Sequence, residues 1–144
     1  MLYFAFGSNL DVEQMQRRCP DSTVAGRALL PGYRLEFSGT SRRWQGGGTC
    51  NIIPAAGSSV PGVLYQLSTE DFDALDRFEG APGRYRRHEI EVETDSGMVT
   101  AVSYTRVDTP IANPPSPAYA ATVAYGYGLH GFGLPALLAT FTPR

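Results

Sequence analysis

Serine and cysteine are the usual nucleophiles of small enzymes, and neither is set up for that role in this sequence. Ser8 lies in the run Gly7-Ser8-Asn9, which lacks the surrounding glycine pattern of a nucleophile elbow. Cys50 falls in an apolar segment that is predicted to be a strand, where a thiol is usually inert core filling. Only His88 and His130 could serve as the base. We therefore expect neither a catalytic triad nor a thiol and histidine pair.

Metal and phosphate sites have equally little support in the sequence. The two histidines and two cysteines stand at no spacing that is typical of metal ligands. The glycine run 46–48 could approach a phosphate, but Thr49 and Cys50 follow it and no lysine is present there. A flexible loop accounts for the run better. We expect no metal and no cofactor.

Two features remain that could carry chemistry. Gly7-Ser8-Asn9 stands where a buried strand ends and a helix begins, so its successive backbone N–H groups could bind an anion or an oxyanion. Glu79 is the last residue of a predicted helix, where the helix dipole disfavours a second negative charge. Burial beside Phe78 would raise the pKa of Glu79 further. On its own, however, a glutamate at a helix end is more often a solvated surface residue.

The elements that must position these residues follow from short apolar runs and turn residues. Breakers at Pro31-Gly32, at a Gly-Ser turn and at Asp95-Ser96-Gly97 separate the predicted strands. These strands are Leu2–Phe6, Val24–Leu30, Tyr33–Ser38, Cys50–Ile53, Val60–Leu67, Tyr85–Thr94 and Met98–Val107. The last two form a predicted hairpin.

Capping residues and apolar spacings predict four helices. The first follows Asn9 or Asp11 and ends near Arg17 and Arg18, and the second begins at Ser68-Thr69 and stops at Gly80. The third begins at Ser116-Pro117 and buries residues four apart, and the fourth covers Leu134–Phe141. Between these elements, residues 39–49 hold Arg42, Arg43 and Trp44 and form the first candidate for a functional loop, while residues 110–117 form a stiff proline-rich connection.

The totals describe one domain, residues 1–144, with a partner that is small. The net charge is only −2, so no overall field would attract nucleic acid or an anionic membrane. The apolar run Leu2–Phe6 is too short for a signal sequence or a membrane span, so we expect a cytoplasmic protein. A chain of this length needs no disulfide, and Cys19 and Cys50 are expected to be free thiols.

Five motifs, in order along the chain, resemble the gamma-glutamylcyclotransferase family and its AIG2-like relatives. Leu2–Leu10 resembles the YGSN loop that opens these proteins, and Leu75–Gly80 followed by Tyr85 resembles the segment that holds their catalytic glutamate. Trp44–Gly47 resembles a tryptophan and diglycine turn of the family, and Pro114–Tyr119 resembles a late proline-rich stretch with a tyrosine. Gly133–Pro135 resembles a Gly-Leu-Pro that follows. Together the five span nearly the whole chain.

This resemblance implies a fold, an activity and a site. The fold would be α+β, a single domain with a curled mixed β-sheet or partly closed barrel and a few flanking helices. The activity would be cyclisation of a gamma-glutamyl group to 5-oxoproline, without a cofactor, with Glu79 as the general base. The substrate would contact Tyr3, Phe4, Ala5, Phe6, Gly7, Ser8, Asn9, Tyr85 and Tyr119. Because relatives include dimers, a homodimer is also compatible with the resemblance.

Cyclisation explains why no nucleophile is needed, since the alpha-amine of the substrate attacks its own gamma-carbonyl. Glu79 would take a proton from the amine and return it to the leaving nitrogen. The N–H groups of the turn would hold either the carbonyl oxygen or the alpha-carboxylate. Phe6 stands where the family motif has tyrosine, which leaves the preferred gamma-glutamyl compound open.

Three other functions are compatible with the same sequence. The leaving group could be an amine or a carrier instead of an amino acid. A non-catalytic module could have kept the cavity, although a binder of an anionic substrate gains nothing from a carboxylate there. A purely structural or interaction domain would require the family motifs to match by chance.

Overall fold

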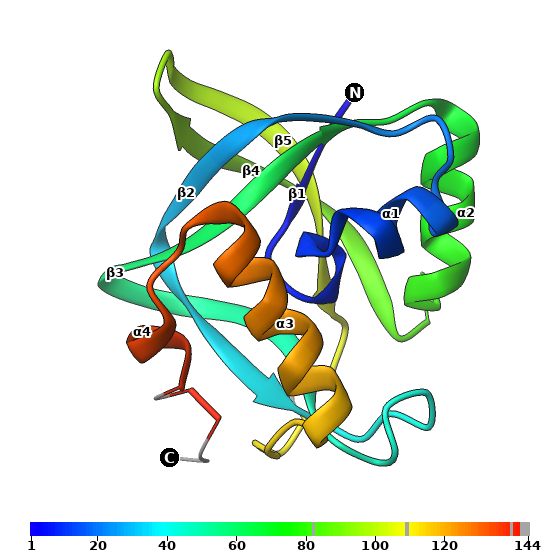
Figure 1. Ribbon diagram of the computed structural model, residues 1–144, viewed down its shortest axis with the longest axis vertical. Helices are drawn as coiled ribbons and strands as arrows, with labels where there is room; N and C mark the ends of the chain where they lie inside the picture. Colours follow the sequence, from blue (N-terminus) through cyan, green and yellow to red (C-terminus); the bar gives the residue numbers. More distant parts are fainter. Residues whose placement is uncertain (82, 109, 139, 142–144) are drawn as a thin grey trace.

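The computed structural model describes residues 1–81, 83–108, 110–138 and 140–141, and these residues form five strands, four α-helices and one 3-10 helix joined by turns and loops (Figure 1). In chain order the elements are β1 (Leu2–Ala5), the 3-10 helix η1 (Ser8–Leu10), α1 (Val12–Arg18), β2 (Thr23–Ser38), β3 (Thr49–Gln66), α2 (Thr69–Glu79), β4 (Tyr85–Thr94), β5 (Gly97–Arg106), α3 (Pro117–His130) and α4 (Leu134–Leu138). None of the described helices is both long enough and apolar enough to cross a bilayer.

The strands form a closed barrel in the order β1, β3, β2, β4, β5. β1 pairs with β3 in antiparallel fashion and with β5 in parallel, through Tyr3 opposite Val102, and the other pairings are antiparallel. Closure removes the free edges that would otherwise invite aggregation. The predicted α+β domain with a curled mixed sheet is thereby confirmed, with the barrel closed rather than partly open.

The predicted turns at Pro31-Gly32 and in the Gly-Ser segment of β3 are wrong. β2 and β3 are single long strands, and the pairing between them passes from Pro31 opposite Ser59 to Tyr33 opposite Pro54. Gly32 and Gly57 each have a φ of 81°, which glycine adopts without strain. These residues therefore mark one shared irregularity at which the two-stranded ribbon bends, and such bends let a sheet curl into a barrel.

The predicted helix signals are present as expected. Ser68 forms a capping box with Asp71 at the start of α2, and α2 ends at Gly80 in the left-handed conformation. Ser116 caps α3, with Pro117 in its first turn. α4 is shorter than predicted: it ends at Leu138 and does not continue to Phe141.

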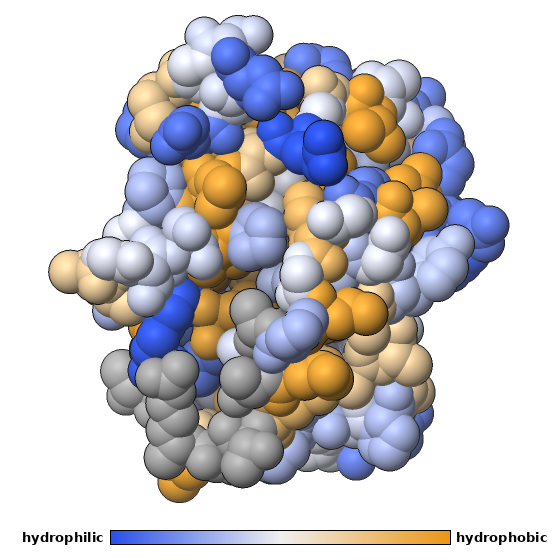
Figure 2. All heavy atoms as spheres, turned by 60° about the vertical axis from the view of Figure 1, so that its left-hand side comes forward, coloured by the Kyte–Doolittle hydropathy of each residue, from blue (hydrophilic) through white to orange (hydrophobic). Residues whose placement is uncertain are grey.

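The helices cover the barrel unevenly. α3 packs against η1, and α1 contacts both η1 and α2 (Figure 1). The end of β1 is thus enclosed by helices, whereas the face in Figure 2 shows apolar side chains interspersed with polar ones. Scattered exposed apolar residues of this kind are normal on a protein surface. The end of β1, with η1 beside it, is where the candidate site lies.

Candidate active site

A cavity of about 300 Å³ lies beside the end of β1. It brings together segments that are far apart in the sequence: β1 and η1, the turn before β3, the end of α2, the facing ends of β4 and β5, and the start of α3. Most of the predicted site residues line it, namely Tyr3, Phe6, Gly7, Ser8, Asn9, Glu79, Tyr85 and Tyr119. Glu79 and the glycine turn therefore border one cavity.

Phe4 and Ala5 are the two predicted residues that do not line the cavity. Alternation along β1 turns Phe4 away from the side of Tyr3, and its fully buried ring packs where a side chain on Gly62 would lie. Ala5 is also fully buried and pairs with Val63 in the sheet. Both residues hold the strand that leads into the turn.

The turn after β1 offers backbone donors. The N–H of Leu10 donates to the Gly7 carbonyl at 3.0 Å, and the N–H of Asp11 donates to the Ser8 carbonyl at 3.1 Å. The N–H groups of Ser8 and Asn9, at the start of this short helix, have no acceptor in the described part of the chain. A side chain on Gly7 would come within 3.1 Å of Cys50 and 3.3 Å of the Tyr119 hydroxyl. A residue with a side chain would push the turn and this wall apart by a few tenths of an ångström, so glycine suits the close approach.

Asn9 connects the turn to the rest of the cavity wall. Its buried side-chain amide donates to the Tyr3 hydroxyl at 3.0 Å, and its side-chain oxygen accepts from Gln14 and from Arg18, each at 3.1 Å. The Tyr65 hydroxyl donates to the backbone carbonyl of Asn9 at 2.7 Å. A largely buried hydrogen-bond network of this kind fixes the geometry of the residues in it.

Glu79 is partly buried at the cavity wall, and its carboxyl group has an unusual acidity. Burial raises the pKa of Glu79 to about 7, although the nearby guanidinium groups of Arg18 and Arg43 act in the opposite direction. This is the direction expected from the sequence. A carboxyl group with a pKa near neutrality can accept a proton and release it again at physiological pH.

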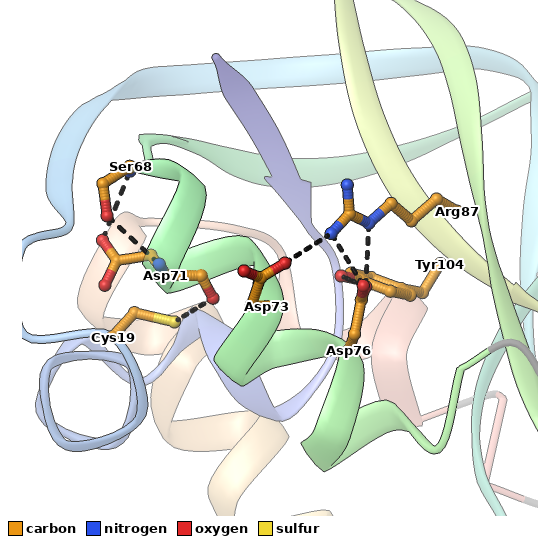
Figure 3. Close-up of polar contacts among 7 residues, drawn as sticks. All are labelled: Cys19, Ser68, Asp71, Asp73, Asp76, Arg87 and Tyr104. Atoms are coloured by element: carbon orange, nitrogen blue, oxygen red, sulfur yellow. Dashed lines mark hydrogen bonds and ion pairs between the residues drawn. The ribbon is translucent and has the colours of Figure 1, made fainter.

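The last turn of α2 is held in place by an ion pair one turn before Glu79 (Figure 3). Asp76 accepts two hydrogen bonds from Arg87, at 2.8 and 2.7 Å, and one from the Tyr104 hydroxyl at 2.6 Å. Partial burial alone would raise the pKa of Asp76, but these bonds lower it overall. Asp76 therefore stays charged and ties α2 to β4 and β5, which fixes the position of Glu79.

An aromatic wall closes another side of the cavity. The Tyr119 hydroxyl accepts a hydrogen bond from the backbone N–H of Cys50 at 2.9 Å, and the Trp44 ring lies 4.8 Å from the Tyr119 ring. Tyr85 and Thr49 share a hydrogen bond of 2.6 Å between their hydroxyl groups. Burial raises the pKa of both tyrosines, so they remain protonated and neutral.

Positive charge in the cavity is the feature that the sequence alone did not reveal. Among the described residues Glu79 is the one acid on the cavity wall, and five arginines share that wall: Arg18, Arg42, Arg43, Arg84 and Arg106. The guanidinium carbons of Arg18 and Arg43 lie 4.7 and 5.2 Å from the centre of the Phe78 ring. This charge suits an anionic ligand. No cluster of three potential metal ligands occurs within the described residues.

A carboxyl group of raised pKa that lines the same small cavity as free backbone donors defines a class of enzyme that moves protons on a small anionic substrate. Comparison with known proteins identifies the family. Residues 3–128 match the family described as gamma-glutamyl cyclotransferase, AIG2-like. The chain belongs to this family.

Individual relatives agree with the family match. The chain is 34% identical over 139 residues to a human protein named gamma-glutamylcyclotransferase, covering 92% of this chain and 73% of that protein. A mouse protein of the same name is 35% identical over 131 residues, covering 87% of this chain and 69% of that protein. A solved structure titled gamma-glutamyl cyclotransferase superposes with a TM-score of 0.89 at 32% identity, over 100% of this chain and 89% of that one.

Proposed function

We propose that this protein cyclises a gamma-glutamyl group to 5-oxoproline and releases an amino acid or an amine. One observation carries the proposal: Glu79, with a pKa of about 7, and the free N–H groups of the Gly7–Asn9 turn line the same cavity. The names of the relatives support the same activity. Their similarity covers more than two thirds of each protein.

The substrate supplies its own nucleophile in this reaction. Its alpha-amine attacks the gamma-carbonyl carbon, a five-membered ring closes, and the bond from that carbon to the leaving nitrogen breaks. Holding the substrate in the folded conformation can supply several kcal/mol, because the reacting groups already belong to one molecule. The cavity, with its aromatic wall and its fixed turn, is suited to impose that conformation.

Glu79 carries out both proton transfers of this reaction. It accepts one from the amine as the new C–N bond forms, and it returns one to the leaving nitrogen as the old bond breaks. An ordinary glutamate lies nearly four pKa units below an amine of pKa about 8, a mismatch of roughly 5 kcal/mol. With a pKa of about 7, Glu79 reduces that mismatch to roughly 1.4 kcal/mol.

The turn is suited to stabilise the developing negative charge. As the ring closes, the carbonyl oxygen becomes an oxyanion, and the N–H groups of Ser8 and Asn9 are available as donors. They contribute without any particular side chain, so Phe6 in place of tyrosine leaves this role intact. The N–H groups could instead hold the alpha-carboxylate, and a crystal soaked with 5-oxoproline would distinguish the two arrangements.

The activity is tested by incubating purified protein with gamma-glutamyl-L-alanine and measuring 5-oxoproline by mass spectrometry. We expect Glu79→Gln to keep the fold, by circular dichroism, and to lower kcat by about 10²- to 10⁴-fold. For the unchanged protein, kcat/KM should fall as the pH drops below about 7, because Glu79 becomes protonated. Glu70→Gln, at an exposed position in the first turn of α2, is the matched control. A Glu79→Gln protein with a near-normal rate would overturn the assigned role.

We also propose a reducing compartment such as the cytoplasm. This is supported by Cys19 and Cys50, which are both buried as free thiols. Burial raises the pKa of Cys50 to about 12 and that of Cys19 to about 11, so both stay unreactive. Acid quenching of cells, alkylation in denaturant and mass spectrometry should find both residues as thiols, and a disulfide or mixed disulfide would contradict the proposal.

A further inference from the structure

The arginines around the cavity differ in what already binds them. Arg106 makes two hydrogen bonds to Asp108, at 3.0 and 3.3 Å, and Arg18 donates to Asn9 at 3.1 Å. Arg43 has no hydrogen-bond acceptor and no acidic partner in the described part of the chain. Its donors are therefore available to a ligand.

Arg43 is nevertheless held in a fixed place. It belongs to the turn 41–48, which is closed by bonds from the N–H of Gly46 to the Ser41 carbonyl at 2.7 Å and from the N–H of Gly47 to the Trp44 carbonyl at 3.0 Å. The N–H of Gly48 donates to the Pro114 carbonyl at 2.9 Å, which docks the turn on the segment before α3. An unpaired guanidinium on a rigid support is pre-organised for binding.

The Phe78 ring holds the guanidinium itself at the cavity mouth. Arg43 lies 5.2 Å from the centre of this ring, and Phe78 is 42% exposed, so the contact lies where the cavity meets solvent. Arg18 contacts the same ring but is tied to Asn9, on the side of the glycine turn. Arg42 and Arg84 also border the cavity and are exposed, as Arg43 is, but neither has an aromatic contact of this kind.

The position of Arg43 relative to Glu79 indicates which part of a substrate it meets. Phe78 precedes Glu79 directly, and the charge of Arg43 is close enough to act on the Glu79 carboxyl group. In the proposed reaction Glu79 returns a proton to the leaving nitrogen. When the leaving group is an amino acid, its carboxylate carbon lies only about 2.5 Å from that nitrogen. The leaving carboxylate must therefore lie near Glu79, in the part of the cavity that Arg43 borders.

We infer that Arg43 binds the carboxylate of the leaving amino acid and makes the protein selective for gamma-glutamyl amino acids over gamma-glutamyl amines. The inference rests on the proposed cyclotransferase function and adds the substrate class to it. A guanidinium and a carboxylate form a charge-assisted, often bidentate, pair. Arg43 is thus a specificity residue at the mouth, separate from the residues of the glycine turn.

The test compares two substrates that differ only in this carboxylate, gamma-glutamyl-L-alanine and gamma-glutamylethylamide. We expect the unchanged protein to prefer the alanine compound in kcat/KM by about 10- to 100-fold, the range of one charge-assisted bond. Arg43→Gln should reduce this preference to about threefold or less, chiefly through a higher KM for the alanine compound. Because the charge of Arg43 also acts on the Glu79 carboxyl group, kcat/KM on the ethylamide should change as well, but by less than on the alanine compound. Arg43→Lys should restore part of the preference.

The controls separate this inference from the proposed function. Arg86→Gln removes the same charge from an exposed position on β4 away from the cavity, and it should keep the full preference. Equal turnover of both substrates by the unchanged protein, or a preference that survives in Arg43→Gln, would overturn the role of Arg43 while leaving the cyclotransferase activity in place. Failure to form 5-oxoproline from either substrate would instead overturn the proposed function, and this inference with it.

Discussion

Asn9 and Arg18 are joined by a hydrogen bond of 3.1 Å from the guanidinium to the side-chain oxygen of Asn9. The same Asn9 side chain donates to the Tyr3 hydroxyl at 3.0 Å, and Asn9 is only 4% exposed. One residue therefore links the glycine turn, the first strand and the end of α1. Because Arg18 in turn lies against Phe78 beside Glu79, Asn9 controls the geometry across the cavity.

Asn9→Ala should weaken both the fold and the site. The Tyr3 hydroxyl and the Gln14 amide would each lose a buried hydrogen-bond partner, which costs about 1–3 kcal/mol of unfolding free energy. We also expect kcat/KM to fall at least about tenfold, since a displaced turn and guanidinium disturb the substrate position. Urea unfolding and steady-state kinetics measure the two effects. Gln16→Ala removes an exposed amide from the neighbouring helix α1 and should change stability by no more than about 0.5 kcal/mol. An equally small effect of Asn9→Ala would contradict the argument.

Features governed by local sequence could be predicted. The caps at Ser68 and Ser116 depend on side chains that bond to the backbone three residues later, and both helices begin where expected. The position of Glu79 at the end of α2 follows in the same way from Gly80. The family motifs then directed attention to this residue, which local rules would have left as surface.

Features governed by distant neighbours could not be predicted. Gly32 signals a turn locally, but its place opposite residues 55–58 of β3 makes it a bend within a continuous strand. The convergence of Arg18 and Arg43 on Phe78 depends on how α1, the turn 41–48 and α2 pack together. No spacing in the sequence encodes that meeting, although Arg43 already lay in the loop singled out as functional.

Glu79→Gln should change stability in a pH-dependent way. The pKa of Glu79 is about 7 in the fold, against 4.5 for an ordinary glutamate, so between these values the unfolded chain ionises first and folding loses stability as pH rises. Above pH 7 the buried charge of Glu79 lowers the free energy of unfolding by up to about 3 kcal/mol, and below pH 4.5 this loss vanishes. The glutamine variant carries no such charge and does not suffer the loss. Urea unfolding should therefore show the variant to be more stable by about 1–3 kcal/mol at pH 8.5 and nearly equal to the unchanged protein at pH 4. The same difference at both pH values would show that Glu79 titrates normally.

Two glycines of α3 should respond to alanine in opposite directions. A side chain on buried Gly126 would overlap the Leu10 side chain and lie 3.2 Å from the Leu10 backbone carbonyl carbon, whereas one on exposed Gly128 would meet nothing within 4 Å. Gly126→Ala should therefore cost about 1–3 kcal/mol and, by displacing Leu10 at the end of η1, lower kcat/KM as well. Gly128→Ala should stabilise the protein by about 0.5–1 kcal/mol, because alanine has the higher helix propensity, and leave the kinetics unchanged. Thermal unfolding and activity assays on the pair measure both effects. Equal responses at the two positions would mean that the contact between α3 and η1 does not support the site.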